Sequence, residues 1–345
     1  MRGWNIIIVV ACLWLTACSP QHDLERHFDT YLTRVASVLG VPAPALTSPQ
    51  PLPELPPQRE LVLAPARIST GLLDSLKLNR CDLLGLVGKH NDPVGRSQSA
   101  AGQLLYHLQF QQGLTQCLQE SDDQELNAWL MHIIEQKQPQ LISYHWNMMI
   151  AEPEIRQALA PAHQSLPFKE QAGYYSTLHA FRLFTRWQEL TEDISNNTER
   201  LTSQSLSEAL SGLYQNPYLG ELFYSLHSAA HYLEQSLTFL QALDDFNCGS
   251  AQQADAKRLR NAMQHYYAKD IQAYLAKIDR QFVQLAPLLQ STLTPPDSKQ
   301  ALMINYQQQI AQNLESTLYV RYRQLTLEHA KLWQRFLKRC DIPAV

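Results

Sequence analysis

The sequence predicts an all-α protein: a multi-helix bundle that ends in a long antiparallel helical hairpin. Charged residues make up only 17% of the chain, and glutamine and leucine, both good helix formers, take their place. Glycine is sparse, with 12 residues in 345, and no Asn-Gly or Asp-Gly turn joins two strand-like segments. Apolar residues instead recur every three or four positions, which is typical of helices that pack on one side.

The first element is a short apolar segment that ends in Leu15-Thr16-Ala17-Cys18-Ser19. It is too short to span a membrane, which takes roughly 20 apolar residues, and it has the proportions of a signal peptide. It resembles the signal of bacterial lipoproteins, which implies cleavage after residues 1–17 and acyl chains, palmitate among them, on Cys18. Ser19 occupies the position after the cysteine, where an aspartate would be the usual signal for retention in the inner membrane. The outer membrane is therefore favoured. The alternatives are an ordinary signal peptide with a chance cysteine, or an uncleaved anchor.

The expected location is therefore the bacterial outer membrane, with the chain lipid-anchored and facing the periplasm. Multiple acyl chains would make this anchoring stable, since one chain alone binds a membrane only marginally. The mature chain would have 328 residues, with 27 basic and 32 acidic side chains. This balance offers no general attraction for nucleic acid, so the membrane is the partner that the sequence predicts most directly.

After the anchor, an amphipathic helix is expected over residues 21–39, followed by a proline-rich segment. Residues 41–65 hold eight prolines in 25 positions, a density that forbids a helix and favours extended polyproline-like backbone. This segment is either a spacer that lifts the body off the membrane or a strip laid over the bundle surface, as Leu61-Val62-Leu63 also suggests. Residues 18–67 are thus assigned to the anchor, the short helix and the proline-rich spacer.

Residues 68–345 are expected to form an all-helical body. Its first seven helices are predicted over residues 68–88, 98–119, 122–137, 140–151, 168–194, 198–215 and 217–246. Three prolines within residues 152–167 mark the best candidate for a subdomain break. The terminal hairpin follows, with arms of nearly equal length over residues 251–293 and 298–339.

Four cysteines remain once Cys18 is lipidated, and an even number in an oxidising compartment favours two disulfides. Three connectivities exist, and the hairpin geometry biases the choice among them. A hairpin with equal arms brings its two ends together, which favours Cys248–Cys340. Cys81–Cys117 then follows by elimination, around a turn at residues 91–95. No spacing is Cys-x-x-Cys, which argues against a thioredoxin-like site or a zinc knuckle.

Two histidines, His227 and His231, are the weak candidates for a metal site. They lie four residues apart on a predicted helix, so both rings face one side, as in many metal sites. The intervening Ser228, Ala229 and Ala230 supply no base, and no third ligand is evident. A packed, hydrogen-bonded histidine and tyrosine ladder is therefore favoured. The sequence predicts no catalytic residue, no metal and no cofactor.

The C-terminal arm is the one strongly basic part of an otherwise acidic chain. Between residues 317 and 345 there are two acidic side chains and six basic ones: Arg321, Arg323, Lys331, Arg335, Lys338 and Arg339. They are a candidate binding face for anionic envelope material, such as lipid headgroups or polysaccharide, or for an acidic protein. The alternative is a solvated face whose cations complement the helix macrodipole.

Two sequence blocks carry a family resemblance. Gly71-Leu72-Leu73-Asp74-Ser75-Leu76-Lys77-Leu78-Asn79-Arg80-Cys81, and then Gln103-Leu104-Leu105-Tyr106 through Cys117, resemble a family of proteobacterial lipoproteins known as domain of unknown function 3080. The resemblance extends over nearly the whole mature chain. It implies a helical, periplasm-facing body with paired cysteines, and it supplies no activity or catalytic residue.

The functional expectation is a non-enzymatic envelope lipoprotein that binds or supports another envelope component. One alternative is an envelope hydrolase whose site forms only in three dimensions. That alternative requires several of His179, Glu221, His227 and His231 to gather around one cavity. Another alternative is a helical bundle that binds a small or lipidic ligand.

Overall fold

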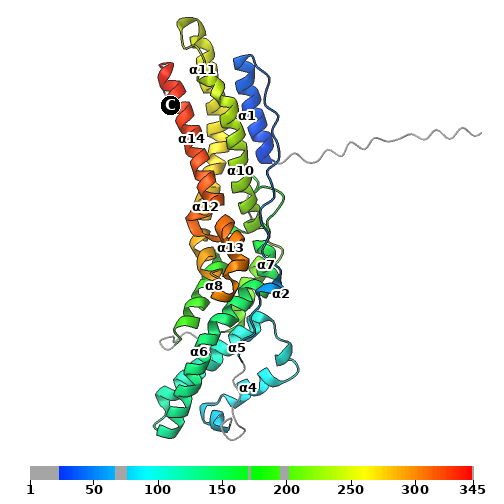
Figure 1. Cartoon of the computed structure of the whole chain (residues 1–345), viewed down its shortest axis with the longest axis vertical. Coiled ribbons are helices and arrows are strands. Elements are labelled where there is room, and N and C mark those ends of the chain that lie inside the picture. Colours follow the sequence, from blue (N-terminus) through cyan, green and yellow to red (C-terminus); the bar gives the residue numbers. More distant parts are fainter. Residues whose placement is uncertain (1–22, 67–75, 170–171, 195–201, 344–345) are drawn as a thin grey trace, which may run out of the picture.

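The computed structural model describes residues 23–66, 76–169, 172–194 and 202–343, and these residues form an all-α fold without strands. The predicted signal segment and Cys18 lie outside the described residues. The helices pack side by side in an upper bundle that continues into a lower group, and together they form a long rod (Figure 1). Among the described helices, none has both the length and the hydropathy that crossing a membrane requires.

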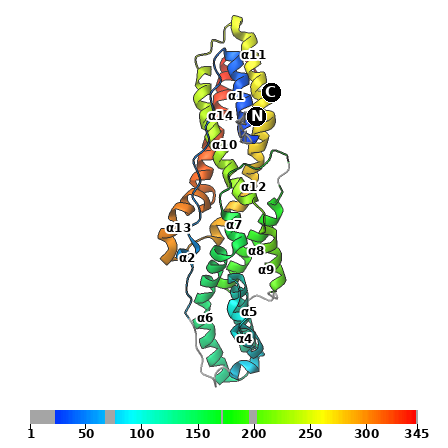
Figure 2. The same ribbon diagram turned by 90° about the vertical axis from the view of Figure 1, so that its right-hand side faces the viewer.

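The upper part of the rod in Figure 1 is a helical bundle. It comprises α1 (Asp23–Leu39), α10 (Tyr218–Leu240), α11 (Gln253–Ala262), the π-helical segment η5 (Met263–Gln272), α12 (Ala273–Thr292) and α14 (Thr317–Arg339). Helix α1 packs against α10, α11 and η5, whereas α14 packs chiefly against α10. Helices α1 and α14 consequently lie diagonally across the bundle, as the two perpendicular views show (Figures 1 and 2).

The remaining helices form the middle and the lower end of the rod. They are α2 (Gln58–Leu61), α4 (Leu84–Asn91), α5 (Ala100–Glu120), α6 (Gln124–Ala151), α7 (Pro153–Leu159), α8 (Tyr174–Glu192), α9 (Ser203–Leu213) and α13 (Gln300–Tyr306). Short 3₁₀ turns η1 (Leu76–Cys81) and η2 (Gly95–Ser97) flank α4. Helices α5 and α6 pack along each other and form the lower end (Figure 2).

Two hydrophobic cores lie along the rod. The main core runs through the bundle and the middle, and it includes α7, which falls within the proposed subdomain break at residues 152–167. A much smaller second core lies between η1, α4 and the distal parts of α5 and α6. We call this end of the molecule the distal lobe. Because α5 and α6 contribute side chains to both cores, they join the lobe to the bundle without a linker.

Two predicted helix boundaries are wrong at residues 68–88 and around Pro139. In the described part of 68–88, the chain forms η1 and then α4, separated at Asp82, whose φ of 54° ends a helical path. Conversely, the two helices predicted at 122–137 and 140–151 form one helix, α6, with Pro139 inside it. Helix α6 packs on both α5 and α8, and these contacts offset the hydrogen bond that proline cannot donate.

The terminal hairpin is also more broken than the sequence predicts. Its first arm is continuous through α11, η5 and α12. Its second arm, predicted as one helix over 298–339, is divided into α13, a π-helical turn η7 (Gln307–Ala311) and α14. The division falls at Asn313, which adopts the left-handed conformation (φ 49°) that asparagine tolerates better than most residues.

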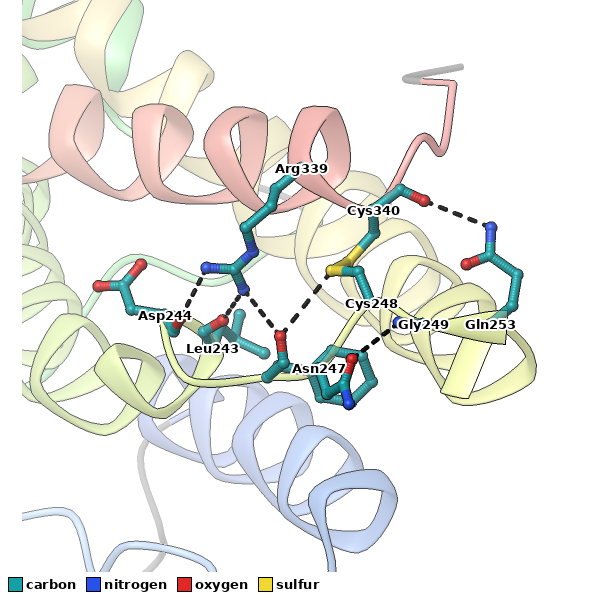
Figure 3. Close-up of a disulfide and its surroundings, with 9 residues drawn as sticks. Leu243, Asp244, Asn247, Cys248, Gly249, Gln253, Arg339 and Cys340 are labelled. Atoms are coloured by element: carbon teal, nitrogen blue, oxygen red, sulfur yellow. Dashed lines mark hydrogen bonds between the residues drawn. A yellow bond between two sulfur atoms is a disulfide. The ribbon is translucent and has the colours of Figure 1, made fainter. Parts of the chain in front are cut away.

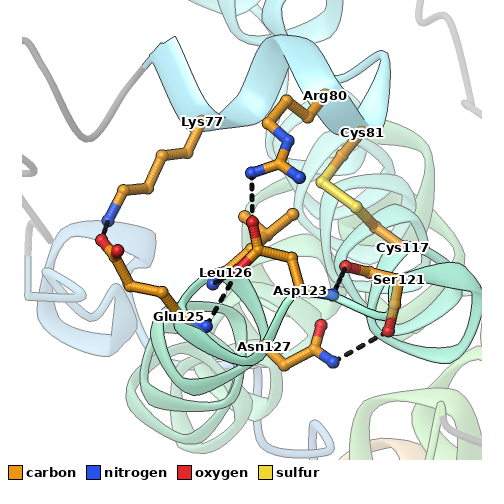
Figure 4. A network of polar contacts seen from close by, with 9 residues as sticks. All are labelled: Lys77, Arg80, Cys81, Cys117, Ser121, Asp123, Glu125, Leu126 and Asn127. Atoms are coloured by element: carbon orange, nitrogen blue, oxygen red, sulfur yellow. Dashed lines mark hydrogen bonds and ion pairs between the residues drawn. A yellow bond between two sulfur atoms is a disulfide. The ribbon is translucent and has the colours of Figure 1, made fainter.

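Two disulfides close the two ends of the rod. Cys248 is joined to Cys340 beside the C-terminal end of α14 (Figure 3), and Cys81 is joined to Cys117 in the distal lobe (Figure 4). Both pairs were expected from the sequence, Cys248–Cys340 from the hairpin geometry and Cys81–Cys117 by elimination. Although the second arm is broken, the end of α14 still returns to the start of the first arm, so Cys248 and Cys340 meet.

Candidate functional site

The proline-rich segment is bound to the body. Residues 41–66, which we call the strap, run from the end of α1 along α10 to α2 (Figures 1 and 2). His227 Nε2 donates a hydrogen bond to the carbonyl oxygen of Gln50 at 2.7 Å, and His231 Nε2 donates to that of Thr47 at 2.8 Å. The two histidines four residues apart therefore hold the strap, and of the two alternatives the structure has the segment laid over the bundle.

The lower half of the strap is fixed by three more side chains. Trp146 Nε1 donates to the Leu61 carbonyl oxygen at 2.9 Å, and Arg156 donates to that of Pro56 at 3.0 Å. Asn147 pairs with both backbone groups of Leu63, at 2.8 and 2.9 Å. Extended proline-rich backbone has carbonyl groups without internal partners, so the body must provide donors for them.

The residues proposed for a three-dimensional hydrolytic site do not come together. His227 and His231 lie under the strap, and burial lowers the pKa of His227. His179 is exposed on α8. Glu221 alone lines a cavity, and there Gln164 donates a hydrogen bond to its carboxylate at 2.6 Å. Across the described residues, no group of three or more histidines, cysteines or carboxylates is placed to hold a metal ion.

The cavity beside Glu221 has a volume of about 840 Å³ and lies where α1 begins. Its lining combines apolar and polar side chains, with Leu166, Ser176 and Asn216 among them, and includes two carboxylates, Asp23 and Glu221. Asn216 Nδ2 donates to the Gly173 carbonyl oxygen at 3.2 Å and to the Thr177 hydroxyl at 3.1 Å. The side-chain amide of Asn216 thus holds the start of α8 against the end of α9.

Three of the six basic residues of the C-terminal arm are engaged within the body. Arg321 pairs with Glu234 of α10, and Arg323 pairs with Asp279 of α12 at 3.4 Å. Arg339 donates to the carbonyl oxygens of Leu243, Asp244 and Phe246, which follow α10 (Figure 3). These three arginines hold α14 in place.

The other three, Lys331, Arg335 and Lys338, are exposed and have no hydrogen-bond or ion-pair partner among the described residues. We call them the basic stripe. Their spacing of four and three residues places them on one face of α14. That face is opposite the buried one, which carries His329, Trp333 and Phe336. The stripe is therefore the part of the predicted binding face that is free to bind another molecule.

Sequence reasoning did not find the donors that hold the strap. Trp146, Asn147 and Arg156 are more than 80 positions away from the carbonyl groups that they bind. The one available signal was the proline-rich composition itself, because a segment rich in unpaired carbonyl groups needs donors if it is to be buried. That signal indicates that donors exist but does not say which residues they are.

The chain matches the model of a known protein family. The family model described as "Protein of unknown function (DUF3080)" matches residues 28–344, which cover the strap, the distal lobe and the bundle. No curated protein and no solved structure matches the chain.

Proposed function

Because the chain belongs to the DUF3080 family, which has no assigned function, we propose its role from its own residues: a lipid-anchored outer-membrane protein that binds an anionic component of the cell envelope. The anchor is supported by the sequence around Cys18, which follows a short apolar segment. Binding is supported by the basic stripe.

The stripe carries this proposal because the macrodipole of α14 accounts for Lys338, in the last turn, but not for the whole stripe. Cations in the last turn of a helix favourably complement its macrodipole, but the effect fades within that turn. Helix α14 ends at Arg339, so Lys331 lies two turns before its end. The bundle already uses other arginines to fix α14, whereas Lys331, Arg335 and Lys338 contact none of the described acidic groups. Three adjacent unpaired cations attract anionic ligands.

Site-specific crosslinking in intact cells tests the binding. A photo-reactive residue replaces Arg335 in the stripe or, as a control, Ile304, which is exposed on α13. We expect one specific adduct, identified by mass spectrometry, from position 335 and none from position 304. Equal adducts from the two positions, or none from either, would contradict binding through the stripe.

The anchor is tested separately with Cys18→Ser. We expect the natural chain to incorporate a palmitate analogue and to sediment with outer membranes. The variant should lose the label and be released by osmotic shock. A Cys18→Ser chain that stays in the outer-membrane fraction would show that something other than the acyl chains holds the protein there.

A further inference from the structure

Exposed aromatic side chains are confined to one place on the described surface. Tyr175 is 81% exposed and Tyr214 is 61% exposed, and every other described phenylalanine, tyrosine or tryptophan is at least partly buried. Tyr175 is at the start of α8, and Tyr214 directly follows α9. Asn216 binds Gly173 and Ser176, so the two helix ends that carry these tyrosines lie next to each other.

Basic side chains lie near the first of these tyrosines, Tyr175. Tyr175, Lys277 and Arg280 line one shallow pocket of about 390 Å³. Lys277 donates to the carbonyl oxygen of Lys169 at 3.0 Å, which places a second lysine beside the first. Arg182 is seven residues after Tyr175 on α8, and therefore on the same face. Arg280 has no hydrogen-bond or ion-pair partner among the described residues.

The same surface adjoins the point from which the chain continues toward Cys18. Asp23, the first residue of α1, lines the same cavity as Ser176, Gly212 and Gln215. From Cys18 to Asp23 is a step of five residues, which reaches at most about 17 Å when fully extended. The strap adds nothing to this reach, because it follows α1 and is bound to the body. An acylated Cys18 thus keeps this surface close to the bilayer.

We propose that this surface rests on the anionic lipid headgroups of the membrane that holds Cys18. We call it the tether patch, and it comprises Lys169, Tyr175, Arg182, Tyr214, Lys277 and Arg280. Tyrosine is favoured at a membrane–water interface because its ring is apolar and its hydroxyl is polar. Basic residues near such a surface are attracted by anionic headgroups. The inference rests on the proposed lipidation of Cys18.

This orientation also explains why the chain has two separate basic surfaces. The basic stripe is on α14, diagonally across the bundle from α1, where the anchor begins (Figures 1 and 2). The tether patch has residues on α8 and α12 and beside the end of α9, and none of them is on α14. The stripe then remains accessible to a partner that is not the anchoring membrane itself.

Depth-dependent fluorescence quenching tests the orientation on the full lipidated chain. A fluorophore is attached to Tyr214→Cys or, as a matched control, to Leu327→Cys, which is 50% exposed on α14. The vesicles contain phosphatidylethanolamine and phosphatidylglycerol in a three-to-one ratio, with a nitroxide-labelled lipid as quencher. We expect at least threefold stronger quenching at position 214 than at position 327. Equal quenching, or stronger quenching at 327, would overturn the proposal.

Two additional measurements separate the possible failures. Palmitate-analogue labelling of the same preparations reports on Cys18: an unlabelled chain contradicts the anchor, whereas a labelled chain with equal quenching contradicts the tether patch alone. In a second variant, Lys169, Arg182 and Arg280 are changed to glutamine. Its quenching at position 214 should fall at least twofold, and unchanged quenching would contradict recognition of anionic headgroups.

Discussion

Each end of the rod is closed by a disulfide, but the two ends are supported by different interactions. At the upper end, Cys340 is buried in the main core, and Arg339 beside it binds three backbone carbonyl groups (Figure 3). At the distal end, Cys117 belongs to the small second core, and ion pairs with largely exposed partners surround the bridge (Figure 4).

Because their supporting contacts differ, we expect the two ends of the rod to unfold separately. Cooperative units in a protein follow the buried apolar contacts that they share, and units with few such contacts open at lower free energy. The upper end shares its core with most of the chain, so its stability is that of the whole bundle. The distal lobe has its own core, with nine buried side chains among the described residues, and is expected to open first.

The largest expected effect comes from removing each disulfide. The bridges close loops of 92 and 36 residues, for which chain entropy predicts about 4 to 5 kcal/mol each. Replacing Cys248 and Cys340 with alanine should lower the global free energy of unfolding by that amount. Replacing Cys81 and Cys117 should lower the hydrogen-exchange protection of backbone amides in the distal lobe. The amides of α10 and α14 should stay protected. Loss of protection throughout the rod from this second variant would contradict separate units.

Acid should destabilise the bundle through its buried histidines. Burial lowers the pKa of His329 to about 3 and that of His145 to about 4. The unfolded chain takes up these protons near pH 6.5, so the free energy of unfolding falls as the pH drops below that value. Between pH 6.5 and pH 5 we expect a loss of about 2 kcal/mol for each histidine. Denaturant titrations should show this loss, and His329→Gln should remove its share of the pH dependence.

A buried hydrogen bond in the bundle provides a smaller test. The Tyr31 hydroxyl of α1 accepts a hydrogen bond from Trp333 Nε1 of α14 at 2.7 Å and lies 3.1 Å from His329 Nε2. Tyr31→Phe leaves the indole N–H buried without a partner, which typically costs about 1 to 3 kcal/mol. We expect the loss in global unfolding by chemical denaturation. If the protection of α1 alone fell, α1 would be a separate unit.

The smallest effect is expected for the surface charges of the distal lobe. Arg80 pairs with Asp123 at 2.8 Å, but both side chains are largely solvent-accessible, so salt should screen the pair. Asp123 also accepts hydrogen bonds from the backbone N–H groups of Glu125 and Leu126 and thereby caps α6 (Figure 4). Asp123→Ala should therefore lower the melting temperature of the lobe more than Arg80→Gln does. The reverse order would show that the ion pair matters more than the cap.

The sequence predicts the features that follow from the local spacing of apolar residues and from helix length. The all-α class followed from composition and periodicity, and the pairing of Cys248 with Cys340 followed from two arms of equal length. Pro139 shows the limit of local reasoning, because the contacts of α6 with α5 and α8 outweigh the missing hydrogen bond. The break at Asn313 is another such limit, since asparagine often occurs within ordinary helices.

The candidate site was predictable only in part. The spacing of His227 and His231 indicated one shared helix face, but their partners in the strap are more than 170 positions away in the sequence. The six basic residues of the C-terminal arm were identified as one group. Which of them are free depends on where Glu234, Asp279 and the carbonyl groups after α10 lie, and only the folded chain determines that.

Binding through the basic stripe is tested most directly by in-cell crosslinking of two charge-matched variants. In the first, Lys331, Arg335 and Lys338 are changed to glutamine; in the second, the same change is made at Lys89, Arg96 and Lys269, which are exposed elsewhere. The photo-reactive residue is at Leu327, exposed on α14. We expect the first variant to lose at least nine-tenths of the adduct and the second to keep it. Equal adduct from both variants would contradict a binding role for the stripe.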